Sequence, residues 1–176
     1  MMRTLLFILL IAFAGAELNA QDALTPRKSP LSTLTYAHDD AFIKVTYGRP
    51  HKRDRVVFGP DGIVPYGKLW RTGANEATEI TLEKDAKING EAVPAGTYSL
   101  FTIPGEKEWT IVLSKDRGLW GAFDYNEEND LLRFKVKSAK SEILYEPFTI
   151  KFITDGNDVD LVMLWDETKV AFDIQL

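Results

Sequence analysis

The sequence predicts an all-β protein: a single antiparallel β-sandwich, jelly-roll-like or a flattened barrel, of about ten strands. Three observations lead to this prediction. Short segments with apolar residues at every second position recur from Leu31 onward. Glycine- and proline-rich turn sequences separate these segments. After residue 20, no stretch combines a helical period with capping residues.

Five segments alternate most clearly, with apolar side chains on one face and polar ones on the other. In chain order they are 41–47 (AFIKVTY), 97–103 (TYSLFTI), 132–137 (LRFKVK), 148–154 (FTIKFIT) and 170–176 (VAFDIQL). Because the last segment includes Leu176, we expect the C-terminus to form part of the sheet.

The expected connections support the same fold. Asn89-Gly90 stands between the short segments 86–88 and 91–93, and this dipeptide is typical of a two-residue hairpin turn. Turns are also predicted at 94–96, 104–105 and 155–157, where proline, glycine, asparagine and aspartate gather.

The first 20 residues predict a secretory signal peptide. A basic start at Arg3 precedes the apolar run 5–14 (LLFILLIAFA), and small residues lead to Ala20. The run is too short for a membrane span, which needs about 20 apolar residues. We therefore expect cleavage after Ala20, a tether over 21–30, a β-sandwich domain over 31–176, and a periplasmic or secreted protein without a membrane anchor.

Composition excludes several classes. The chain has no cysteine, so no disulfide and no lipid-bearing cysteine is expected. Its formal net charge of −5 disfavours nucleic-acid binding, which requires a basic surface. The two histidines, His38 and His51, have no partners at metal-ligand spacing, so neither a metal nor a cofactor is expected.

Residues 47–76 are the strongest candidate for a binding site. Arg49, Arg55 and Arg71 lie there among glycines and prolines, and their planar guanidinium groups suit carboxylate or phosphate. We expect the three side chains to gather at one rim of the sandwich. The alternative is that they pair with nearby acidic residues and hold the loops together.

Other candidates for ligand contact are polar or aromatic and lie in turns or at strand ends. They are Tyr47, Tyr66, Trp70, Asn75, Glu76 and Trp120. An indole beside a turn could stack on a sugar or fill the core. Trp109 and Trp165 fall within strand patterns and are expected in the core.

Glu76 is a weak candidate for a catalytic residue. Asn75-Glu76 resembles the dipeptide that carries the acid/base carboxylate in many barrel glycosidases, but such barrels take about 250 residues. A two-carboxylate mechanism also needs a second acid within roughly 5–10 Å.

Several motifs occur together in a fixed order. They are 47–50 (YGRP), 57–59 (VFG), 65–76 (PYGKLWRTGANE), 95–104 (AGTYSLFTIP), Trp109, 120–122 (WGA), Tyr125 and the closing 165–174 (WDETKVAFDI). On these residues the chain resembles the domain-of-unknown-function 2911 (DUF2911) family of bacterial exported proteins, typical of Bacteroidetes envelopes. Residues 51–55 (HKRDR) depart from the Lys-Gly-Arg expected there. The resemblance implies an exported β-sandwich and supplies no catalytic residue.

Three functions are compatible with these features. The first is a periplasmic binding or accessory domain for a small anionic or sugar-like ligand. The second is a hydrolase using Glu76 and a partner carboxylate. The third is a structural envelope protein in which the arginine-rich loops only fasten the fold. The binding role is favoured over an enzymatic one.

Overall fold

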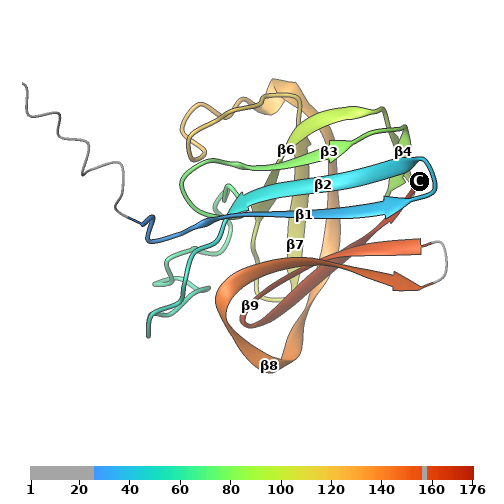
Figure 1. The fold of residues 1–176 in the computed structure, drawn as a ribbon. Coiled ribbons are helices and arrows are strands. Elements are labelled where there is room, and N and C mark those ends of the chain that lie inside the picture. The colour runs from blue at the N-terminus through green and yellow to red at the C-terminus, as the bar shows by residue number, and fades with distance from the viewer. Residues whose placement is uncertain (1–25, 156–157) are drawn as a thin grey trace, which may run out of the picture.

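The computed structural model describes residues 26–155 and 158–176. The predicted signal peptide, residues 21–25 of the tether, and Gly156 and Asn157 of the last predicted turn lie outside the described residues. Within them the protein is all-β, as predicted, with one antiparallel sheet of nine strands in the order β1-β2-β3-β6-β7-β8-β9-β4-β5 (Figure 1). No helix in these ranges is long and apolar enough to cross a membrane.

The elements follow the chain in order. They are β1 (Leu31–His38), β2 (Ala41–Gly48), β3 (Thr78–Leu82), β4 (Ala86–Ile88), β5 (Glu91–Val93), β6 (Gly96–Ile103), β7 (Glu108–Ser114), the 3-10 turn η2 (Glu127–Asn129), β8 (Asp130–Asp155) and β9 (Asp158–Gln175).

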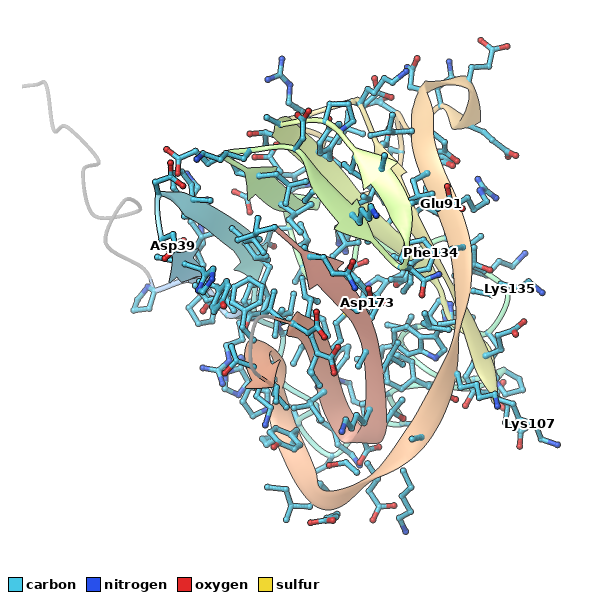
Figure 2. All side chains as sticks on the ribbon, turned by 90° about the vertical axis from the view of Figure 1, so that its right-hand side faces the viewer. Asp39, Glu91, Lys107, Phe134, Lys135 and Asp173 are labelled. Carbon is cyan, nitrogen blue, oxygen red and sulfur yellow. The ribbon has the colours of Figure 1, made fainter. Side chains whose placement is uncertain are left out.

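The long strand β8 turns the single sheet into two facing layers. Its first part pairs with β7, up to Lys137 opposite Glu108, and its later part pairs with β9 from Ser138 onward. The register shifts between Lys140 and Thr149, where the strand bends. Figure 2 shows β8 descending one side of the molecule and turning back at the bottom. The sheet is therefore sandwich-like and is not closed into a barrel.

Aromatic contacts join the two layers. The ring of Tyr36 in β1 lies 5.9 Å from that of Phe152 in β8, and Tyr47 in β2 lies 5.6 Å from Phe148. The Tyr47 hydroxyl also accepts a hydrogen bond of 3.0 Å from the Ile150 amide. These contacts fix β1 and β2 over the later half of β8.

The nine strands agree with the predicted number of about ten, but two of the predicted strands, 132–137 and 148–154, are the two parts of β8. The Asn89-Gly90 hairpin is confirmed: β4 pairs with β5, and both turn residues have positive φ values, 51° and 84°. The C-terminal strand is also confirmed, since Gln175 pairs with Lys87 and Ile174 with Ile88, but it ends at Gln175 and does not include Leu176.

The main core contains an aromatic cluster. Trp109 and Trp165 are each 2% exposed, as expected, and Trp70, at 8%, joins them. The Trp70 and Trp165 rings stack at 5.7 Å, while Phe58 meets Trp109 edge-on at 5.0 Å. The cluster fills the space between the layers.

A second, smaller cluster lies on the outer face of β6 and β7. Phe101 and Val112 are fully buried there, beneath Leu69, Leu119, Ala122 and Tyr125. Both faces of β6 are therefore buried, because loops cover the face that the sandwich does not use. These loops hold the candidate site.

Candidate functional site

Two long connections meet over the outer face of β6 and β7. The β2–β3 connection, residues 49–77, and the β7–β8 connection, residues 115–129, exchange backbone hydrogen bonds. The Ala77 amide donates to Leu119 O at 2.9 Å, and the Gly121 amide donates to Asn75 O at 2.9 Å. Glu76 and Trp120 face each other across this short antiparallel bridge. The bridge fixes the position of one loop against the other.

Tyr125 anchors the second connection to β8. Its hydroxyl donates to Asp130, with oxygen–oxygen distances of 2.8 and 2.9 Å, and accepts from Arg133 Nη2 at 2.7 Å. Burial and then the bond to Asp130 raise the pKa of Tyr125 to about 12. The phenol therefore stays protonated and keeps donating at neutral pH.

Arg71 stands where the two loops meet. The preceding residue, Trp70, exchanges backbone hydrogen bonds of 2.7 and 2.9 Å with Thr102 of β6. The backbone carbonyl of Arg71 accepts a hydrogen bond of 3.0 Å from the Thr78 amide. Its side chain runs beside Gly121, where a Cβ atom would lie 2.8 Å from Nη1. Gly121 has a φ of 71°, so both its conformation and its surroundings favour glycine.

The Arg71 guanidinium has no hydrogen-bond or salt-bridge partner among residues 26–155 and 158–176, and its Nε is buried. Burial lowers the pKa of Arg71 below its ordinary value. A partly desolvated cation without a counter-charge is unfavourable, and an anion at the Nη groups, which are not buried, would relieve part of that cost.

A small cleft opens at this guanidinium. It has a volume of about 280 Å³ and is lined by Leu69, Trp70, Arg71, Ala122 and Phe123. Phe123 is 81% exposed, so it forms an outer wall of the cleft. The cleft thus combines apolar walls with one positive charge.

The guanidinium groups of the other two candidate arginines each donate two hydrogen bonds within the protein. Arg49 Nε donates to Phe148 O at 3.2 Å, and its Nη2 donates to Thr149 Oγ1 at 3.0 Å. Arg55 donates to Lys52 O at 2.9 Å and to His51 O at 2.6 Å. The three guanidinium groups therefore share no partner: Arg49 fastens β2 to β8, Arg55 closes its own loop, and only Arg71 faces the small cleft.

The remaining predicted aromatic residues lie in different places. Tyr47, 2% exposed, is a core residue, and Trp70 donates from Nε1 to Gly73 O at 2.9 Å inside the aromatic cluster. Tyr66 is 37% exposed and lines a separate cavity of about 520 Å³ with Phe58 and Trp109. Trp120 is 55% exposed on the second loop, beside Glu76.

Asn75 and Glu76 help to hold the N-terminal segment. Asn75 Nδ2 donates to Ser29 O at 3.3 Å, and Arg27 Nη1 donates to both carboxylate oxygens of Glu76 at 2.8 and 3.0 Å. Burial acts to raise the pKa of Glu76, but a backbone hydrogen bond and Arg27 outweigh it, so the pKa lies below its ordinary value. Glu76 is therefore ionised at neutral pH and forms an ion pair with Arg27.

No group of three metal-ligating side chains occurs in the described part of the chain.

Sequence reasoning did not single out Leu69, Gly121, Ala122 or Phe123. The 120–122 motif did mark the second loop, but within it only Trp120 was predicted to contact a ligand. A single phenylalanine two residues after a turn glycine does not indicate a binding site until the segment that packs against the loop is known.

The fold and this site define a class: a single-sheet, sandwich-like all-β domain whose two longest connections jointly form a small cleft. The family described as "Protein of unknown function (DUF2911)" matches residues 29–174, and the chain belongs to that family. No match was found among curated proteins or among solved structures.

Proposed function

We propose that this protein is a binding domain that receives an anionic group of a small ligand at Arg71. The observation that supports this proposal is the guanidinium itself, which is partly buried and unpaired within the described residues beside a cleft. A carboxylate matches its two-pronged donor geometry. A sugar-like ligand without charge would leave the cation unpaired, so the anion is preferred.

Glu76 has less support as a catalytic residue. Its salt bridge to Arg27 favours the ionised form, whereas a general acid needs a raised pKa. The bonds of Arg49 and Arg55 favour the loop-fastening role that the sequence offered as the alternative. The binding proposal therefore rests on Arg71 alone.

The decisive experiment is calorimetric titration with a panel of small carboxylates, inorganic phosphate and neutral sugars. Arg71→Ala should weaken binding of the responding anion by at least about tenfold, since hydrogen bonds to charged groups contribute about 1.5–3 kcal/mol. Arg71→Lys should recover only part of the loss, because lysine keeps the charge without the planar fork.

Arg55→Ala is the matched control, because its guanidinium already donates to backbone carbonyls within its own loop. It should leave the affinity unchanged. Equal affinity for the wild type and Arg71→Ala would remove Arg71 from any binding site. A response to neutral sugars alone would replace the anion proposal.

We also propose that the protein acts after export, supported by the charged, apolar and small-residue order of residues 1–20. Expression in a Gram-negative host followed by fractionation tests this. A mature chain beginning at Gln21 in the periplasm or medium is expected, and an uncleaved cytoplasmic chain would contradict it.

A further inference from the structure

We infer that the ligand at Arg71 is an amphipathic monocarboxylate, whose acid group meets the guanidinium and whose apolar body lies against Phe123. This inference rests on the proposed binding function and specifies its ligand class. It depends on the juxtaposition of one cation and several apolar walls in a single small cleft.

The charge of the cleft favours a single negative charge. Arg71 is the only cationic side chain among the residues that line it. The whole protein carries a net charge of −5, so a dianion would be repelled more strongly than a monoanion. One planar fork can hold one carboxylate through two parallel hydrogen bonds.

The walls of the cleft favour an apolar ligand body. Leu69, Ala122 and Phe123 bring apolar side chains to the lining, whereas the indole of Trp70, the other apolar lining residue, packs in the core cluster. Leu69 and Ala122 also pack on Phe101 and Val112, so this wall is continuous with the outer apolar cluster and is held in place by it. Burial of apolar ligand surface there would add affinity in proportion to the area covered.

Gly121 brings the charge and the apolar wall together. A Cβ atom at this position would lie 2.8 Å from Arg71 Nη1 and 2.8 Å from Phe123 Cε2. The guanidinium and the phenyl ring therefore flank the same glycine. A carboxylate at Arg71 would place the adjoining carbon atoms next to Phe123.

The size of the cleft favours a small molecule. Its volume of about 280 Å³ is just below the range of about 300–1,000 Å³ that ligand pockets span. A short alkyl or aryl acid matches this volume better than a polymer.

The test is a calorimetric titration of the full mature protein with acetate, butyrate, hexanoate, octanoate and 3-phenylpropionate, together with 1-octanol, succinate and inorganic phosphate. Affinity should increase by about fourfold for each methylene that becomes fully buried. It should level off once the cleft is full. Octanol, which lacks the charge, should bind at least about tenfold more weakly than octanoate. The phenyl acid distinguishes a cleft that prefers rings from one that prefers linear chains.

Phe123→Ser should reduce the gain in affinity per methylene, so it should weaken octanoate binding more than acetate binding. Because Phe123 is 81% exposed, this change should not affect folding, and circular dichroism can verify that. Ile143→Ser, at a 61% exposed position outside the lining of this cleft, is the matched control and should behave as wild type.

Two outcomes separate the inference from the proposed function. Arg71-dependent binding that does not vary with chain length, or tighter binding of succinate or phosphate, would overturn the amphipathic ligand while leaving an anion site in place. Binding of no carboxylate, or binding that persists in Arg71→Ala, would overturn both.

Discussion

Replacing Arg71 by methionine is expected to raise the free energy of unfolding of the unliganded protein. The folded state buries Nε of Arg71, and no group in the described ranges accepts a hydrogen bond from its guanidinium. An unsatisfied buried polar group costs about 1–3 kcal/mol. Because Arg71 is only partly buried, we expect a gain near the lower end, about 1 kcal/mol. Methionine removes the charge and keeps an apolar stem of similar length against the loop.

Arg49→Met is the matched comparison, because Arg49 is also partly buried but bonds to Phe148 O and Thr149 Oγ1. Its removal deletes two hydrogen bonds, each contributing about 0.5–1.5 kcal/mol. We therefore expect Arg49→Met to lower the free energy of unfolding by about 1–3 kcal/mol.

Urea denaturation followed by tryptophan fluorescence measures both changes, since the chain has four tryptophans and three of them lie in the core cluster. The two midpoints should move in opposite directions, with unchanged denaturant dependence. If Arg71→Met lowered the free energy of unfolding as much as Arg49→Met, Arg71 would stabilise the fold, and the argument for a binding site would be wrong.

Three further predictions concern the sheet, the cleft and pH. Removing residues 173–176 should lower the free energy of unfolding, measured with urea, by about 3–6 kcal/mol, because fully buried Ile174 and its pairing with β4 are lost. Removing Leu176 alone should change it little. A urea midpoint equal to that of the wild type after removal of 173–176 would contradict the prediction. Gly121→Ala should weaken binding of the Arg71 ligand by more than about tenfold in calorimetry, since the new methyl group displaces Arg71 or Phe123, and unchanged affinity would contradict the geometry. The pKa of Glu76 is lowered in the folded state, so its ionised carboxylate adds stability at pH values above its unfolded pKa of about 4. That stability is lost as the pH falls through the folded pKa, and Glu76→Gln should therefore flatten the profile of stability against pH between about pH 5 and 3. Parallel profiles for the variant and the wild type would refute this prediction.

The sequence predicted the strands because one-sided burial gives a period of two. Ile43, Val45 and Tyr47 are all buried on the inner face of β2, in agreement with the pattern. The continuity of β8 was missed, since exposed Ile143 and Leu144 and the following Pro147 interrupt the alternation where the strand bends. A bend with register shifts looks like the end of a strand when its pairing partner is unknown.

The candidate site was predicted less well, because local sequence does not specify long-range partners. Arg49 and Arg71 occur in one glycine- and proline-rich segment, yet Arg49 bonds to Phe148 and Thr149, about one hundred residues away. Trp70 and Trp120 both adjoin turns, but one is 8% exposed and the other 55%. Which arginine remains unpaired depends on strands that no local pattern identifies.

The placement of Arg71 is hard to explain by folding requirements alone. The backbone around it is fixed by Trp70 pairing with Thr102 and by Thr78, so the loop does not need the guanidinium to hold its shape. The neighbouring Gly121 leaves room for the side chain and makes no hydrogen bond to it. A side chain that lowers stability and fastens nothing is the pattern expected where binding and stability make opposing demands. If that reasoning is right, a saturating carboxylate should stabilise the wild type and should leave Arg71→Met unaffected, so that the ligand reverses the stability order of the two proteins.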